Sequence, residues 1–340
     1  MRVLSGLFIA FVIFVVAAVG VGFFLPDQAH VERSTLIDAP PATVYAVLGG
    51  FKQFNRWSPW ADLDPKTQYL YSGAPFGPGA RQKWQSDDPN VGGGSQEILE
   101  ATPYSQVKVR LSFDSMSTEN QLTYTLTPEG EGTRLVWAMD TGFGGDLLNR
   151  YFGLLFDRMI GPDFEKGLSR LKPFVESLPK DDFTSADFSL REVAARPLAL
   201  LPVETPFTEA APVLTAAYTR IGEFVAASGR RIVDTAITVT RRYDEQTQLW
   251  TVDAALPIDQ ACTPAAEEDG VQCRSSYAGW VIYARHKGAY ASIPAHYASL
   301  RSFKTAAGLE DNGDRWEQYV SDPATTPEAE LATDLYWPIK

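Results

Sequence analysis

With 340 residues, the chain is too long for one ordinary small domain and fits two, at ~100 to 200 residues per domain. Its 45% hydrophobic and 21% charged residues exclude a disordered chain, and its 2 cysteines exclude a disulfide-dense scaffold. The formal net charge of -12, from 42 acidic and 30 basic residues, argues against nucleic acid as a partner, because phosphate binding needs clustered Lys and Arg.

The amino terminus carries an uncharged apolar run over residues 3–25. A helix of that length reaches roughly 35 Å at ~1.5 Å per residue, enough to cross a hydrocarbon core of ~30 Å. We expect residues 1–26 to form a transmembrane anchor in the lipid bilayer, with a cleaved signal peptide as the alternative. Arg2 precedes the run and Asp27 follows it, so the positive-inside rule predicts residues 27–340 on the periplasmic side of the inner membrane.

Cys262 and Cys273 are the only cysteines, and export would let them form a disulfide across a short connection. Such a bridge contributes roughly 2 to 3 kcal/mol on the chain-entropy model. Two free thiols are the alternative. No metal site is expected, because His30, His286 and His296 follow no metal-ligand spacing.

The region over residues 27–178 is predicted to contain a strand, two short helices, an antiparallel meander and a long final helix. The short helices are expected over 43–48 and 51–56, and the final helix over 146–177. The strands are expected over 31–37, 68–71, 81–85, 95–101, 106–113, 120–127 and 133–139. The final helix has an apolar face that we expect to bury against the sheet, made of Leu148, Phe152, Leu155, Met159, Leu168, Leu171 and Val175.

This order of elements, with Ile37–Pro40 before the first helix and Trp57–Trp60 after the short pair, resembles the START-like or polyketide-cyclase-like (SRPBCC) superfamily. Gly167–Lys172 in the final helix is similar as well. The resemblance implies a helix-grip fold, in which a curved sheet wraps a long terminal helix around a cavity for a hydrophobic ligand. Trp57 and Trp60 are candidates to line such a cavity, and ordinary core or rim packing is the alternative for both.

A polar linker is expected over residues 179–188, and the region over 189–340 contains an internal repeat. Each copy is predicted as a β-α-β-β unit, with helices over 206–227 and 292–307, and we expect a concave groove on the sheet face away from the helices. The strands are expected over 189–193, 198–203, 236–242, 250–256, 276–285, 314–320 and 332–337. The matching pairs are Tyr218 with Tyr297, Ile221 with Leu300, Phe224 with Phe303, Gly229 with Gly308, Asp253 with Asp334, Pro257 with Pro338 and Ile258 with Ile339.

The second copy carries the segments His286–Tyr290, Trp316–Tyr319 and Pro327–Pro338. Their spacing closely resembles the GyrI-like effector-binding domain, best known as the drug-sensing half of transcription regulators. The resemblance implies a buried glutamate that faces aromatic rings in the groove, and in this chain that residue is Glu317, with Tyr319 two positions on. A transcription regulator is not expected, because no helix-turn-helix precedes the domain and the chain is acidic.

A carboxylate among aromatic rings offers a charge partner and ring faces to a flat organic cation, with cation–π energies of ~0.5 to 2 kcal/mol each. Neutral aromatic ligands fit as well. Strand alternation favours Tyr283 on the groove side, with Tyr290 at the loop and Trp337 on the last strand. Filling of the core is the alternative for each ring.

The patterns predict an α+β chain with a duplicated β-α-β-β domain and one transmembrane helix, and the resemblance to the START-like superfamily implies that the first domain is a helix-grip fold. Its expected function is binding of small hydrophobic or aromatic molecules, cations among them, outside the cytoplasm and without a cofactor. One alternative is a hydrolase of reactive small molecules, with Glu317 as general base beside Tyr283 or Tyr290. A cyclase-type enzyme in the first domain is another.

Overall fold

In a computed structural model, the chain forms two compact units. The structure describes residues 2–115, 118–180, 182–261 and 270–340. The units comprise residues 1–182 with 305–308 (unit 1) and residues 183–304 with 309–340 (unit 2). Both units are rich in sheet and carry helices, in agreement with the α+β prediction.

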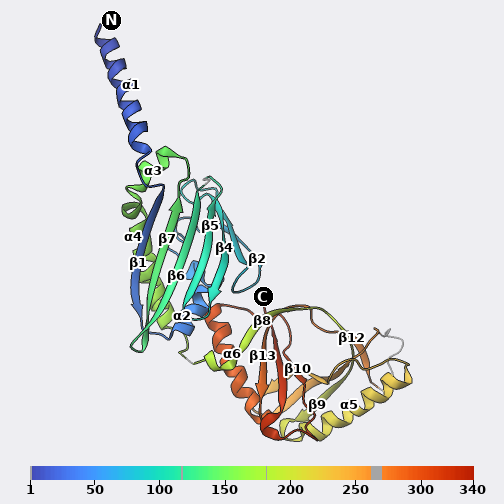
Figure 1. Ribbon diagram of the computed structural model, residues 1–340. Helices are drawn as coiled ribbons and strands as arrows, with labels where there is room; N and C mark the ends of the chain where they lie inside the picture. The colour runs from blue at the N-terminus through green and yellow to red at the C-terminus, as the bar shows by residue number, and fades with distance from the viewer. Residues whose placement is uncertain (1, 116–117, 181, 262–269) are drawn as a thin grey trace. The chain divides into compact units, whose positions relative to one another are not determined.

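Unit 1 is built on a seven-stranded antiparallel sheet with the order β1-β7-β6-β5-β4-β3-β2 (Figure 1). Strands β2 to β7 follow one another as a meander, and β1 adds to the edge beside β7 because the first strand pairs with the last. Both helices expected near the amino-terminal strand form, the second as a short 3-10 turn, Phe54–Arg56. The strands are β1 (Gln28–Ile37), β2 (Gln68–Gly73), β3 (Ala80–Gln85), β4 (Gly93–Thr102), β5 (Gln106–Phe113), β6 (Glu119–Glu129) and β7 (Gly132–Gly142).

The core of unit 1 lies between the sheet and two helices, α2 (Pro41–Leu48) and α4 (Phe156–Glu176). The ring of Phe164 on α4 stacks on Trp137 of β7, with ring centroids 4.0 Å apart. Gly167 lets the helix approach this closely, because a Cβ there would lie 2.6 Å from the Trp137 ring.

The long helix predicted over 146–177 is wrong in its first half. Residues 147–153 form a separate helix, α3, which Asp146 caps by accepting hydrogen bonds from two backbone N–H groups, and α4 begins only at Phe156. The carboxyl-terminal half of the predicted apolar face is buried as expected, at Leu168, Leu171 and Val175. The amino-terminal half is exposed and comprises Leu148, Phe152, Leu155 and Met159. The helix is interrupted at residues 154–155, so α3 does not continue along the axis of α4 as the single predicted helix would.

Helix α1 (Arg2–Gly22) precedes the sheet of unit 1. Within the described residues, no helix meets the length and apolarity that crossing a membrane requires. The transmembrane helix predicted over residues 3–25 is therefore not supported by the structure.

Unit 2 is built on an eight-stranded antiparallel sheet with the order β12-β9-β11-β10-β14-β15-β13-β8. Strand β12 was not predicted; it is a four-residue edge strand that pairs with β9. The strands are β8 (Phe188–Val193), β9 (Pro197–Pro206), β10 (Ile237–Asp244), β11 (Leu249–Pro257), β12 (Gln272–Ser275), β13 (Gly279–Lys287), β14 (Trp316–Tyr319) and β15 (Ala332–Pro338). The helices are α5 (Ala210–Ala227) and α6 (Ile293–Ala307), and 3-10 turns cover Thr184–Ala186, Phe207–Glu209, Tyr290–Ser292 and Glu328–Glu330.

The sheet order of unit 2 shows the sequence repeat. Strands β9, β11 and β10 on one side mirror β13, β15 and β14 on the other, so a pseudo-two-fold axis passes between β10 and β14. Helices α5 and α6 are both followed by a glycine in the left-handed region, Gly229 with φ 69° and Gly308 with φ 70°. Each glycine is therefore conformationally required where it recurs.

Candidate functional site

Glu317 lies at the centre of the unit 2 sheet, on the pseudo-two-fold axis. It is directly opposite Thr238 across the β10–β14 pair, and these two positions are equivalent in the two copies of the repeat. On β14 the buried Trp316 and Gln318 point to one face of the sheet, so Glu317 and Tyr319 point to the other. The repeat thus places a carboxylate and a hydroxyl side by side at the middle of one face.

The face that carries Glu317 is the one covered by the helices. Tyr218 of α5 reaches Thr238 with its hydroxyl, 2.7 Å from Oγ1, and also donates to the Ile237 carbonyl at 3.1 Å. Tyr297 of α6, the repeat partner of Tyr218, packs edge-on against Trp337, with centroids 5.8 Å apart. The expected position of Glu317, in a groove away from the helices, is therefore corrected: in each copy a helix tyrosine reaches over the same face as the carboxylate.

A short chain of hydroxyl groups leads to the carboxylate. The Tyr319 hydroxyl donates to Thr238 Oγ1 at 3.0 Å and lies 3.4 Å from Glu317 Oε2, so its single proton has two acceptors. The ring of Tyr290 packs edge-on against Tyr319, with centroids 5.5 Å apart. We call Glu317, Tyr319, Thr238, Tyr218 and Tyr290 the Glu317 cluster. Four of its five members, all except Thr238, are partly exposed, so solvent and ligands have access to them.

Burial among these rings changes the protonation of the cluster. Desolvation raises the pKa of Glu317 to about 7, although the Tyr319 hydrogen bond and the Arg315 charge act in the opposite direction. Burial also raises the pKa of Tyr319 well above its ordinary value, and the Glu317 charge adds to this shift. Near neutral pH the carboxyl group is therefore about half ionised while the phenols stay protonated.

Arg315 is a functional candidate that sequence reasoning missed. It lies two residues before Glu317, and its guanidinium sits 4.8 Å from the centroid of the Tyr297 ring and 4.9 Å from that of Trp337. Within the described part of the chain, no carboxylate forms an ion pair with this guanidinium. The protein thus places a cation of its own on two aromatic faces beside Glu317.

Of the rings predicted to face Glu317, the structure brings Tyr319, Tyr290 and Trp337 to the correct face. Trp337 is buried and donates from Nε1 to Asp311 Oδ1 at 2.6 Å, and this hydrogen bond fixes the position of its ring at the edge of the site. Tyr283 is not part of it.

Tyr283 is directly opposite Tyr336, on the other face of the sheet. Its ring packs against Tyr336 at 5.3 Å, and its hydroxyl donates to Asp334 Oδ1 at 2.9 Å. The guanidinium of Arg191 covers the ring at 3.4 Å from the centroid. The expectation that Tyr283 faces Glu317 is therefore wrong, because strand alternation selects the other set of residues on β13.

Tyr218, Tyr297 and Thr238 are further members of the site that were not predicted as such. The two tyrosines stood out in the sequence as repeat positions, and the offset that relates them also relates Thr238 to Glu317. That offset was the available signal. Arg315 left no comparable signal, because its position between two rings depends on tertiary packing.

In unit 1 the two predicted ligand contacts lie in different environments. Trp57 is 2% exposed and packs edge-on against Phe54, Tyr124 and Trp137. Trp60 is partly buried and donates from Nε1 to Asp163 at 3.1 Å. Trp57 is therefore a core residue in this conformation, and a ligand contact for either ring stays a prediction.

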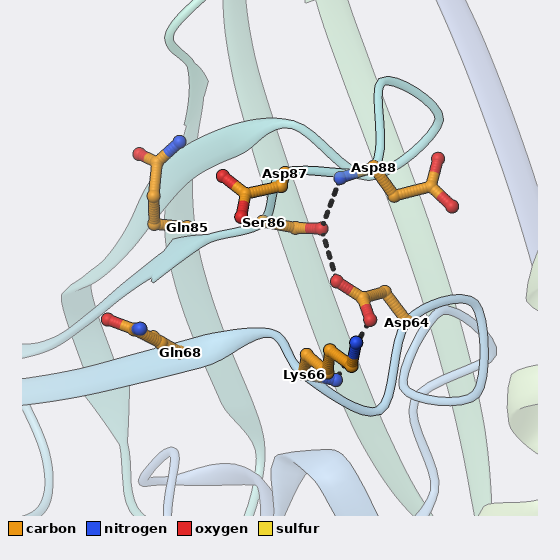
Figure 2. A pocket seen from close by; sticks show the side chains of 7 residues that line it. All are labelled: Asp64, Lys66, Gln68, Gln85, Ser86, Asp87 and Asp88. Atoms are coloured by element: carbon orange, nitrogen blue, oxygen red, sulfur yellow. Dashed lines mark hydrogen bonds between the residues drawn. The ribbon is translucent and has the colours of Figure 1, made fainter.

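Unit 1 also has a polar pocket of about 350 Å³ near the start of β2 and the end of β3 (Figure 2). Ser86 donates to Asp64 at 2.5 Å and accepts from the Asp88 backbone N–H at 2.9 Å. The Ser86 hydrogen bond lowers the pKa of Asp64 below its ordinary value. This pocket is charged and hydrogen-bonded internally, unlike the apolar cavity that the resemblance implied.

The predicted disulfide concerns Cys262, which lies outside the described residues, and Cys273 on β12, which is disulfide-bonded. His286 and His296 are in contact, with their Nδ1 atoms 3.3 Å apart, whereas His30 bonds to Asp140 in unit 1. Among the residues that the structure describes, no three His, Cys, Asp or Glu side chains come together as a metal site would require.

Comparison with solved structures finds several similar chains, at low identity. One is a complex of EcmrR with DNA, with 14% identity over 63% of this chain and 88% of that one, and a TM-score of 0.42. Another is a hydrolase from Listeria innocua, which is 13% identical; the match covers 46% of this chain and 92% of the hydrolase chain, with a TM-score of 0.37. A protein from Chromobacterium violaceum is 18% identical; the match covers 45% of this chain and 99% of that protein, with a TM-score of 0.31. No conclusion about function is drawn from similarities at this level.

No curated protein sequence matches the chain. Two family models do. Residues 28–176 match the model described as polyketide cyclase / dehydrase and lipid transport, and residues 186–340 match the GyrI-like small molecule binding domain. The chain is therefore similar to two families in this order: residues 28–176 to the polyketide cyclase / dehydrase and lipid transport family, and residues 186–340 to the GyrI-like small molecule binding domain.

Proposed function

We propose that the Glu317 cluster binds small aromatic molecules. The observation that carries this proposal is a carboxyl group with a pKa of about 7, partly exposed and flanked by the rings of Tyr319 and Tyr290. Such a group accepts a hydrogen bond when ionised and donates one when protonated, while the rings supply apolar and stacking surface. The match of residues 186–340 to a small-molecule-binding family supports the same function.

The charge of the site favours neutral aromatic ligands near neutral pH. Arg315 carries a full positive charge, whereas Glu317 is only about half ionised there. A lipophilic cation would also compete with Arg315 for the faces of Tyr297 and Trp337. Cationic ligands should therefore bind better as the pH rises above about 7 and the carboxylate becomes fully ionised.

Fluorescence anisotropy of rhodamine 6G, titrated with the full chain, tests this function. We expect saturable binding that is tighter at about pH 8.5 than at about pH 5.5, and that loses its pH dependence in Glu317→Gln. Glu330→Gln, an exposed carboxylate of the same unit, is the matched control and should behave as wild type. Equal affinity of wild type and Glu317→Gln at the higher pH would contradict the proposal.

A second candidate function is hydrolysis of electrophilic small molecules. A carboxyl group with a pKa of about 7 is suited to act as a general base near neutral pH, and Tyr319 lies within 3.4 Å to orient or share its proton. Tyr283 is not available as the partner, because it lies on the other face. Screening aryl esters and epoxides with wild type and Glu317→Gln decides the question, since equal rates would exclude Glu317 as the base.

For unit 1 we propose binding of a hydrophobic ligand, with Trp57 and Trp60 beside it. Support comes from the match of residues 28–176 to a family described by lipid transport. Because Trp57 is buried, the ligand must open the core to reach it. Quenching of tryptophan fluorescence by a brominated fatty acid, compared between wild type and Trp57→Phe, tests this. Identical quenching in the two proteins would exclude Trp57 as a contact.

The location is a separate proposal, namely that residues 27–340 lie outside the cytoplasm and that residues 3–25 attach the chain to the inner membrane. The attachment rests on the sequence alone. The disulfide-bonded state of Cys273 supports an oxidising compartment. Fusing alkaline phosphatase after Lys340 tests the proposal, because that enzyme is active only after export. An inactive alkaline phosphatase together with an active β-galactosidase fusion would contradict it.

A further inference from the structure

An exposed apolar stripe runs along α3 and the start of α4. Leu148 and Phe152 are four residues apart on α3, and Leu155 and Met159 are four residues apart at the start of α4, so each pair shares one side of its helical segment. They are large and mostly solvent-exposed, unlike the surface of a typical soluble domain. The stripe consists of Leu148 (72% exposed), Phe152 (59%), Leu155 (52%) and Met159 (58%).

The stripe is fixed to the carboxyl-terminal end of α1. The Tyr151 hydroxyl donates to the Ala18 carbonyl at 2.5 Å, and Arg150 donates to the Leu25 carbonyl at 3.3 Å and to the Gly144 carbonyl at 2.9 Å. Gly22 is buried against Tyr151 and Leu147, where an added Cβ would lie 3.3 Å from the tyrosine ring. Figure 1 shows α3 at this end of α1, where the chain enters the sheet. The helix that carries Leu148 and Phe152 is therefore anchored beside the carboxyl-terminal end of α1.

Most apolar side chains of α1 between Leu7 and Val21 are exposed, on every side of the helix. A protein partner or a second copy of the chain would cover one side of such a helix, whereas a liquid acyl phase contacts every side. Two of the carboxylates near the stripe are engaged: Asp157 bonds to Arg33 at 2.7 Å, and Asp146 caps α3. The exposed residues of α1 include Leu7, Phe8, Ile9, Phe11, Val12, Ile13, Phe14, Val15 and Val16.

We infer that the stripe of Leu148, Phe152, Leu155 and Met159 is a lipid-contacting surface that rests in the boundary between headgroups and acyl chains. Amphipathic helices with an apolar stripe of this kind lie in that boundary, parallel to the membrane. With α3 held to the end of α1, unit 1 would sit directly against the membrane. This inference rests on the proposed membrane attachment of residues 3–25 and is independent of the Glu317 cluster.

Site-directed spin labelling of the full chain tests the surface. A nitroxide is attached to Phe152→Cys, and the protein is added to vesicles of phosphatidylcholine with a minority of phosphatidylglycerol. Accessibility to oxygen, which concentrates in the acyl phase, is compared with accessibility to a water-soluble nickel chelate. Leu70→Cys is the matched control, since Leu70 is an apolar residue of β2 in the same unit and is 65% exposed.

We expect oxygen accessibility to exceed that of the nickel chelate several-fold at position 152, and the reverse at position 70. Three results would overturn the inference. The first is an aqueous signature at position 152, and the second is a label there that neither reagent reaches, which means that protein covers the stripe. The third is a folded protein, as judged by the label at position 70, that does not bind the vesicles.

Discussion

Replacing Glu317 with glutamine should stabilise the protein at high pH. The folded state raises the pKa of this carboxyl group from 4.5 to about 7, because burial among rings disfavours its charge. The protonated form is therefore favoured in the folded state, and its stabilising contribution is complete below about pH 4.5 and is lost as the pH rises through about 7. Glutamine is neutral at every pH and avoids this loss.

The magnitude follows from the size of the pKa change. A rise from 4.5 to about 7 corresponds to at most ~3.5 kcal/mol, at ~1.4 kcal/mol for each tenfold change in proton affinity. Partial exposure of the side chain reduces this figure, so we expect about 2 kcal/mol. The stability of Glu317→Gln minus that of wild type should increase by this amount between about pH 4.5 and about pH 8.5.

Urea unfolding of the full chain at several pH values measures this difference. The transition of unit 1 serves as an internal reference, because the substitution lies in unit 2. Glu330→Gln removes an exposed charge from the same unit and should show no comparable trend. A stability difference between Glu317→Gln and wild type that stays constant with pH, or that decreases as the pH rises, would refute the assignment of Glu317 as a desolvated carboxyl group.

Three further predictions concern the site and the core. Arg315→Gln should tighten the binding of tetraphenylphosphonium by about tenfold, because the Arg315 guanidinium no longer competes with the ligand for the rings of Tyr297 and Trp337. The same substitution at the exposed Arg301 should leave the affinity unchanged. Calorimetry that finds equal affinities for wild type and Arg315→Gln would exclude competition. Tyr319→Phe removes a hydrogen bond that lowers the pKa of Glu317, so the pH at which rhodamine 6G binding changes should move upward, and a downward shift would contradict the geometry. Gly167→Ala should destabilise unit 1 by roughly 1 to 3 kcal/mol in urea unfolding, because the new Cβ would lie 2.6 Å from the Trp137 ring. Gly222→Ala in α5 is the control and should not destabilise the protein, because no atom lies within 4 Å of the added Cβ. Equal effects of the two substitutions would show that α4 can move away from the sheet.

Much of the fold could be predicted from local patterns. The alternating runs of unit 1 specified the seven strands, and the repeat in unit 2 specified two copies of one β-α-β-β unit. The break at residues 154–155 was not predictable in this way, because apolar spacing continues across it from Leu148 to Met159. Periodicity shows which residues share a side of a helix, but it does not show whether that side is buried.

The candidate site was predictable only in part. Glu317 and Tyr319 share a face because they are two residues apart on a strand, and the resemblance pointed to both. Which residues of β13 share that face depends on the register with β15, which placed Tyr283 on the opposite side. The contact of Arg315 with Tyr297 and Trp337 joins three separate elements, so no local pattern revealed it.

Hydrogen–deuterium exchange of the full chain, with and without saturating rhodamine 6G, tests the central claim that aromatic molecules bind at the Glu317 cluster. We predict slower exchange in peptides that cover β14 and the turn Tyr290–Ser292, and weaker protection of these peptides in Glu317→Gln at the same rhodamine 6G concentration and about pH 8.5. Protection confined to unit 1, or protection of β14 that persists unchanged in Glu317→Gln, would contradict the claim.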